Sequence, residues 1–275
     1  GGSFEAPIAG NTIINLGNGR VFNTFAGSCN ADILGHTETY IGTDGGFPWV
    51  RDHVYGGNDL GGKIIGSGDF SARVSDEAGN MVHKNNATHV LTASAYVEYH
   101  QGRVDRIFGG CYGDYDYDGE YNAYTPPFFD NAFVNFKPVS NSNNKAKAIF
   151  GAGQGHSQMI TGANMQNRSY VLIDIAGTSN HFKEMDVFGS GAFVGLGMGV
   201  DAGIAGDAET ADQASAIIDL ARGQINAVYG GSYEEGITRR TVVNVPQGTT
   251  QKSTIKLNKI SLDRKSGSAG MPRPI

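Results

Sequence analysis

The sequence predicts an all-β fold built from one repeated unit, as in a parallel β-helix. Glycine makes up 41 of the 275 residues and proline only 8, and this glycine share is about twice the usual ~7%. Together with 14 phenylalanines and 12 tyrosines, this indicates a turn-rich chain with a packed core rather than a disordered one. Two short motifs also recur along the chain, each with the side-chain pattern of a strand.

The first motif ends in an aromatic residue and a cluster of small residues. It reads glycine, polar, aliphatic, two variable positions, usually an aliphatic, then the aromatic. Its aromatic positions are Phe25, Tyr55, Phe108, Phe150, Phe188 and Tyr229. Their spacing is typical of solenoid coils or propeller blades. In a β-helix equivalent side chains stack about 4.8 Å apart, so we expect the aliphatic and aromatic residues to point inward and form ladders.

The second motif lies upstream of the first and places an acid or amide between two apolar residues. It occurs at residues 14–16, 97–99, 134–136, 173–175, 218–220 and 243–245. Such alternation predicts strands whose polar side chain points outward. Most copies run into a glycine turn, so one unit is strand, glycine turn, strand, aromatic and glycine corner.

Two folds accept this unit, a parallel β-helix and a kelch-like β-propeller. Val54-Tyr55-Gly56-Gly57 looks like the hydrophobic-Gly-Gly signature of kelch blades, but those blades also carry a tryptophan and this chain has only Trp49. Residues 216–233 resemble better the glycine-rich repeats of surface and secreted proteins from gut bacteria of the Bacteroides group. The resemblance covers roughly residues 12–260. It implies a right-handed parallel β-helix in an extracellular or outer cell-surface location, and it carries no catalytic motif.

The same pattern predicts a single β-helix domain over residues 1–260, with loop insertions at about 69–86 and 114–130. Ser261 stands where the next aromatic belongs, and residues 261–275 form a polar tail or cap. The 27 acidic and 21 basic residues give a net charge of −6, which disfavours nucleic acid as a partner. No apolar stretch approaches the ~18 residues of a transmembrane segment.

The second insertion contains the strongest local motif for chemistry, a D-x-D-x-D-G run. Alternating carboxylates on a tight loop suit calcium, as in EF-hand loops. The ligands we expect are Asp114, Asp116, Asp118 and Glu120. Thr125 replaces the bidentate glutamate that usually closes such a loop, so a solvated acidic turn is the alternative.

The same loop carries tyrosines that we expect to bind sugars, whose rings have apolar faces for stacking. These are Tyr115, Tyr117, Tyr121 and Tyr124. The alternative is that their rings pack within the loop.

For catalysis, the candidates are carboxylates of the second motif. If Asp174 and Asp219 occupy the same position in adjacent coils, they lie about one strand spacing apart, close to the ~5 Å of retaining glycosidases. Glu98 lies further along the same face. The alternative is a structural ladder, because asparagines share this position in other copies.

We therefore expect a non-enzymatic, adhesin-like protein that binds glycans or cell-surface ligands, with a polysaccharide lyase or glycoside hydrolase as the alternative. A lyase needs a positive strip. The candidate cations Arg103, Arg106, Lys145, Lys147 and Lys183 cluster only in the strand approaching the corner, and residues 51–53 beside Trp49 look like a polar turn.

The two cysteines, Cys29 and Cys111, each follow a glycine corner, with the corner after Tyr55 between them. Two coil steps separate their Cα atoms by about 9–10 Å, beyond the ~7 Å limit for a disulfide. We expect free thiols.

The calcium motif gives a first prediction. Calcium should raise the melting temperature by a few degrees, because a ligand that binds only the folded state stabilises it. Asp116→Ala should abolish this increment. Differential scanning fluorimetry with calcium or chelator measures both effects, and an identical melting curve under the two conditions, with no heat in titration calorimetry, would leave the loop as a simple turn.

Overall fold

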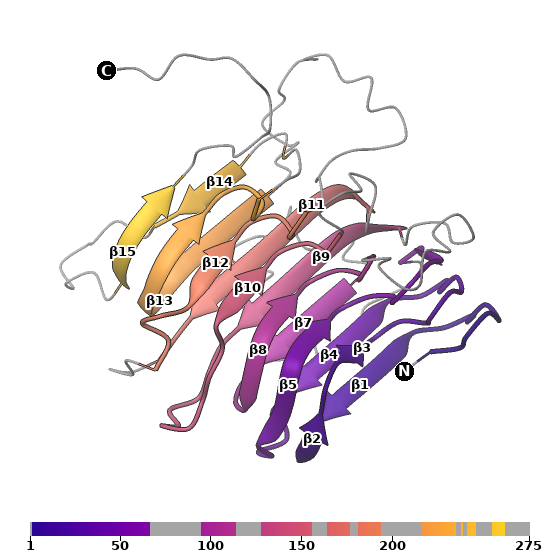
Figure 1. Cartoon of the computed structure of the whole chain (residues 1–275), viewed down its shortest axis with the longest axis horizontal. Helices are drawn as coiled ribbons and strands as arrows, with labels where there is room; N and C mark the ends of the chain where they lie inside the picture. Colours follow the sequence, from indigo (N-terminus) through magenta and orange to yellow (C-terminus); the bar gives the residue numbers. More distant parts are fainter. Residues whose placement is uncertain are drawn as a thin grey trace.

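The computed structural model describes residues 2–66, 95–113, 128–155, 164–176, 181–193, 216–234, 238, 241–245 and 255–261. Every strand pair in this part of the chain is parallel, and none of it is helical. The strands stack into a parallel β-helix (Figure 1), which confirms the predicted fold class. The kelch-like propeller is wrong, because propeller blades are antiparallel sheets.

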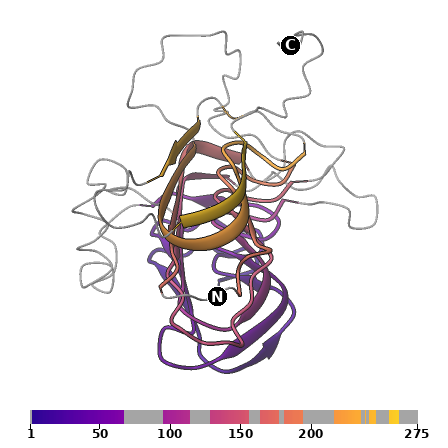
Figure 2. The ribbon, with the colours of Figure 1, turned by 90° about the vertical axis from the view of Figure 1, so that its left-hand side faces the viewer.

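Each coil of the β-helix contributes one strand to each of two opposite sheets. Sheet A contains β1 (Thr12–Leu16), β4 (Thr37–Ile41), β7 (Ala95–Tyr99), β9 (Phe128–Phe136), β11 (Asn164–Asp174), the first part of β13 (Ala216–Tyr229) and β14 (Thr241–Asn244). Sheet B contains β2 (Gly19–Val21), β3 (Thr24–Phe25), β5 (Pro48–Tyr55), β8 (Arg103–Phe108), β10 (Ala148–Phe150), β12 (Asp186–Phe188), the second part of β13 and β15 (Ile255–Ser261). The short β6 (Lys63–Ile64) pairs with the start of β9. Figure 2 shows the two sheets as facing walls.

Aliphatic side chains from both walls form the main core. Sheet A contributes the stacked row Val97, Val134, Val171 and Ile218, and sheet B the stacked row Val54, Ile107, Ile149, Val187 and Val228. All of these side chains are buried. Because the same aliphatic type recurs at the same place in each coil, each side chain packs on its counterparts above and below.

The aromatic residues of the first motif form one continuous ladder. Phe25, Tyr55, Phe108, Phe150, Phe188 and Tyr229 lie in register, with neighbouring ring centroids 4.5–5.0 Å apart and ring planes within 14° of parallel. This confirms the repeat. The expected inward direction is wrong, however. Ile107 points into the main core, so the next residue, Phe108, points to the opposite face and packs in a second cluster with Tyr112, Ala192 and Phe193.

Glycines make the two corners of a coil possible. Gly102, between β7 and β8, has φ +128°, a conformation that side chains disfavour. Gly109, after the aromatic ladder, lies so close to the next coil that a Cβ would be 2.5 Å from the carbonyl oxygen of Gly151. Substitution at either position therefore forces the coils apart.

The structure bears on two further expectations. Ser261 pairs with Tyr229, so a serine does replace the aromatic in the last described coil. Strand β9 begins at Phe128, so the last three residues of the expected 114–130 insertion belong to a strand.

Both cysteines are free thiols, as predicted. Strand β5 separates the coil of Cys29 from that of Cys111, because β3 and β8 pair with its opposite edges. Burial raises the pKa of both thiols, so neither forms the reactive thiolate readily. No helix in the described ranges is long and apolar enough to span a membrane.

The aromatic ladder gives a stability prediction. Phe150→Ala should lower the free energy of unfolding by about 3–5 kcal/mol, because it leaves a cavity between two stacked rings. Phe150→Leu should cost about 1–2 kcal/mol, since it keeps most of the volume and loses the stacking. Urea denaturation measures both, with Phe4→Ala, at a side chain 61% exposed, as the control. Equal losses for the leucine and alanine variants would mean that ring stacking, rather than volume, dominates at this site.

Candidate functional site

The outer face of sheet A carries a row of mainly polar side chains, one from each coil. In order along the stack they are Asn15, Tyr40, Glu98, Asn135, Leu172, Asp219 and Asn244. The polar middle residues of five predicted copies of the second motif therefore do share one row. The coil of β4 was missed, because tyrosine stands in its polar place and a threonine in its first apolar place.

The predicted alignment of Asp174 with Asp219 is wrong. Leu172 lies opposite Asp219, and the pairing shifts between Ile173 and Asp174, so that Asp174 lies opposite Arg222. The guanidinium of Arg222 donates to both carboxylate oxygens of Asp174, with Nη2 3.2 Å from Oδ2. The register thus does not give the side-by-side carboxylate pair expected for a retaining glycosidase.

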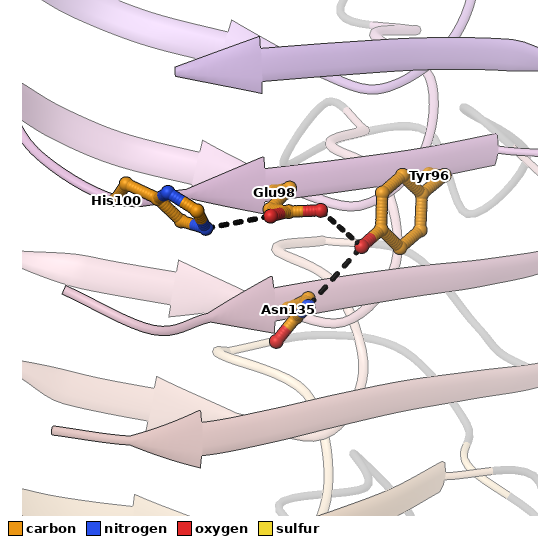
Figure 3. Close-up of polar contacts among 4 residues, drawn as sticks. All are labelled: Tyr96, Glu98, His100 and Asn135. Carbon is orange, nitrogen blue, oxygen red and sulfur yellow. Dashed lines mark hydrogen bonds and ion pairs between the residues drawn. The ribbon is translucent and has the colours of Figure 1, made fainter. Parts of the chain in front are cut away.

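Four residues of β7, β9 and the turn after β7 form a polar network on this face (Figure 3). His100 Nε2 lies 2.6 Å from Glu98 Oε1, and the Tyr96 hydroxyl donates to Glu98 Oε2 at 2.6 Å. The Asn135 amide donates in turn to the Tyr96 oxygen at 3.1 Å. Residues 96 and 98 point to the same face because side chains alternate along a strand. The local pattern Tyr-x-Glu-x-His is therefore sufficient to build most of this network.

The network holds Glu98 in its charged form. Burial acts to raise the pKa of Glu98, but hydrogen bonds from His100 and Tyr96 outweigh it, and the net pKa lies below the ordinary value. Burial raises the pKa of Tyr96 well above its ordinary value, and the Glu98 carboxylate raises it further. A tyrosine with such a pKa stays protonated and donates to the carboxylate at neutral pH.

Tyrosine–carboxylate pairs recur along the same face. The Tyr40 hydroxyl donates to Glu38 at 2.5 Å within β4. The Tyr170 hydroxyl donates to Asp219 Oδ2 at 2.5 Å, and the Asn244 amide donates to Oδ1 of the same carboxylate at 2.5 Å. The rings also contact one another between coils, with the Tyr40 and Tyr96 centroids 5.9 Å apart.

These contacts do not favour acid–base chemistry at the predicted catalytic residues. Glu98 and Asp219 each accept hydrogen bonds on both oxygens, and Asp174 is held by Arg222. A general acid requires a carboxyl with a raised pKa, whereas the pKa of Glu98 is lowered. On the outer face of sheet A these polar pairs lie among buried apolar side chains that include Phe133, Leu172 and Ile217. Asn135 Oδ1 is buried without a hydrogen-bond partner among the described residues.

The outer face of sheet B differs, because it exposes cations. Arg20, Trp49 and Arg103 lie side by side in β2, β5 and β8, and Lys145 follows in the next coil. We call these four residues the basic row. The guanidinium carbon of Arg20 lies 4.2 Å from the Trp49 ring centroid, and that of Arg103 lies 5.9 Å from it. All four side chains are exposed.

More cations flank the basic row. The Arg51 guanidinium lies 5.0 Å from the ring of Phe22, which is 62% exposed. Arg106 lies opposite His53 in the neighbouring coil. Lys147 forms an ion pair with Asp105.

Residues 51–53 are not the polar turn expected from the sequence, since they lie within strand β5. The four residues of the basic row were not grouped on the basis of the sequence. Its members belong to four different coils, and only the coil register, anchored by the aromatic ladder, brings them together.

His53 on this face has a lowered pKa. Burial and the nearby Arg106 lower its pKa, against the opposing charges of Asp105 and Asp52. Its Nδ1 lies 3.0 Å from the Tyr55 hydroxyl, which donates to Gln154 at 2.7 Å. A histidine whose pKa lies below ~6.5 is neutral at pH 7.

The predicted calcium ligands and sugar-binding tyrosines lie outside the described residues. They are Asp114, Asp116, Asp118 and Glu120, and Tyr115, Tyr117, Tyr121 and Tyr124. Within the described ranges, no group of three or more His, Cys, Asp or Glu side chains is placed to hold a metal ion.

The parallel stacking of its coils places the protein in the class of parallel β-helices. No protein-family model matches the sequence, and comparisons with curated proteins and with solved structures gave no significant match.

The Glu98 network gives a prediction of pH-dependent stability. Because the folded-state pKa of Glu98 is lowered, its stabilising effect is present above the unfolded pKa of ~4.3 and is lost as pH falls through the folded value. Glu98→Gln should therefore lower the free energy of unfolding at pH 7 by about 1–3 kcal/mol. The difference from wild type should shrink below about pH 4.

Urea denaturation at several pH values measures this difference. Glu184→Gln, at an exposed turn position, is the matched control and should show no loss. A Glu98→Gln deficit that stays constant from neutral to acidic pH would contradict the assigned charge state.

Proposed function

We propose that the protein is a non-enzymatic β-helix that binds glycans through the outer face of sheet B, outside the cell or at its surface. The observation that supports this proposal is the basic row, in which Trp49 is 37% exposed between two arginines. Tryptophan and arginine are the residues most enriched at energetically dominant positions of binding sites.

The row is suited to binding because its donors are held in place. A guanidinium has five N–H donors in a rigid plane, and stacking on an aromatic ring restrains it before a ligand arrives. Sugar hydroxyls and acidic groups supply the matching acceptors. The spacing of strands in a sheet, about 4.8 Å, is also close to the length of one sugar residue in an extended chain.

The calcium loop and its tyrosines complete this proposal. Asp114, Asp116, Asp118 and Glu120 would bind calcium, and the four tyrosines within and after this run would add stacking surfaces for sugar rings.

A carbohydrate-active enzyme, such as a lyase, is the second candidate. The basic row supplies the positive strip that a lyase needs, and one further observation favours the enzyme. His53, which is neutral at pH 7, lies beside Arg106 on the same face as the basic row. A neutral imidazole beside a cation is a combination that serves proton abstraction next to a carboxylate. Incubation with a panel of polysaccharides tests it: new reducing ends or unsaturated products that disappear in His53→Ala would favour the enzyme.

Trp49 makes the binding proposal directly measurable, because it is the single tryptophan of the chain. A glycan bound at the basic row should shift the fluorescence emission and protect the ring from iodide quenching. Trp49→Ala should weaken binding at least tenfold in titration calorimetry, since truncating a central aromatic usually costs more than ~1.4 kcal/mol.

Phe4→Ala, which removes an exposed aromatic from the N-terminal segment, should leave the affinity unchanged. A glycan that binds the Trp49→Ala variant as well as wild type would place the binding site elsewhere. If a broad glycan array gives no ligand at all, the proposal of glycan binding fails.

A further inference from the structure

We infer that the glycan bound at the basic row is an acidic polysaccharide, whose uronate or sulfate groups contact the arginines and lysine of consecutive coils. This inference rests on the proposed glycan-binding function and specifies the class of ligand. It follows from the charges of sheet B, from the way they are held and from their spacing.

The first observation is an uncompensated positive charge. The cations are Arg20, Arg51, Arg103, Arg106 and Lys145, and none of them forms an ion pair with a carboxylate within the described part of the chain. Of the nearby carboxylates, Asp105 is paired with Lys147, and Asp52, beside Arg51 in β5, also lies near His53. The basic row itself contains three cations and no acid, so its charge is opposite in sign to the net charge of −6 of the whole chain. A local field of this kind attracts anions.

The second observation concerns what holds the cations. Three of the arginines stack on aromatic rings, Arg20 and Arg103 on Trp49, and Arg51 on Phe22. Among described residues, the one hydrogen bond from these guanidinium groups runs from Arg103 Nε to the Asn143 carbonyl at 3.4 Å. Stacking uses the faces of the guanidinium and leaves its N–H edge for an acceptor, and that edge matches a carboxylate or sulfate in a bidentate manner.

The third observation is the spacing along the stack. Arg20 and Arg103 lie two coils apart, with Trp49 between them, and Lys145 lies one coil further. At about 4.8 Å per coil, the row extends over roughly 14 Å. A polysaccharide that runs along the stack, across the strands, would thus meet a cation at every one or two sugar residues. Neutral glycans have no group that uses this charge.

The test is a titration monitored by Trp49 fluorescence and by calorimetry. Four probes are used: a polyuronate such as polygalacturonate, a sulfated polysaccharide such as heparin, a neutral polysaccharide such as dextran, and single-stranded DNA as a non-sugar polyanion. We expect at least one of the two acidic polysaccharides to bind. The comparison of polyuronate with heparin shows which anion the row prefers. Affinity should fall steeply with salt, because binding releases counterions.

The variant R20Q/R103Q should lose at least tenfold in affinity and show a weaker salt dependence, because two contacts to anions are removed. Lys63→Gln removes an exposed cation of β6, which pairs with sheet A, and serves as the charge-matched control with unchanged affinity. Urea denaturation of each variant verifies that it is folded.

The outcomes separate the inference from the proposed function. Binding of dextran alone overturns the acidic ligand and leaves glycan binding in place, whereas binding of no polysaccharide overturns both. Equal affinity for single-stranded DNA and the acidic polysaccharides would show a non-specific polyanion surface and overturn the inference. Unchanged affinity of R20Q/R103Q would likewise overturn it.

Discussion

The register between coils is the constraint on which the rest of this structure depends. Parallel main-chain pairing places each residue beside its counterpart in the next coil, so one residue type must suit a whole row. The glycine corners maintain this register. At Gly109 the next coil is so close that only a residue without a Cβ fits. A one-residue slip would exchange the inner and outer faces of a strand, and the aromatic ladder would lose its stacking.

The same constraint explains the tyrosine–carboxylate pairs on the outer face of sheet A. Carboxylates in neighbouring coils would repel each other at strand spacing. The chain avoids this arrangement by alternating residue types along the row, with Asn135 and Leu172 between Glu98 and Asp219. Glu38, Glu98 and Asp219 each have a tyrosine donor beside them, which offsets their desolvation, and the buried Asp174 is paired with Arg222. These pairs share the face with buried apolar residues such as Phe133 and Ile217.

Much of the fold was predictable because the aromatic and glycine positions of the repeat are strong local signals. The aromatic of each unit, from Phe25 to Tyr229, was assigned correctly. The placement of Asp174 was not, because 171–173 and 173–175 both offer an apolar–x–apolar pattern. The pairing of β11 with β13 selects the first, with Leu172 opposite Asp219. The sequence also did not show that the aromatic ladder points away from the main core, since an aromatic side chain suits either the core or a second cluster. The basic row escaped it because its four members are separated by segments of unequal length.

Under the proposed function, the outer face of sheet A contributes to stability and the outer face of sheet B to recognition. On sheet A, Glu98 and Asp219 accept hydrogen bonds from neighbours within one or two coils, so changing them alters mainly folding. On sheet B, Arg20, Arg51 and Arg103 stay exposed and are braced by aromatic rings rather than by carboxylates. Stacking restrains a guanidinium without neutralising it, whereas an ion pair would do both. Positive charge that is ordered in advance and left unneutralised lowers the entropy cost of binding an anion. For this reason we propose sheet B, and not sheet A, as the recognition surface.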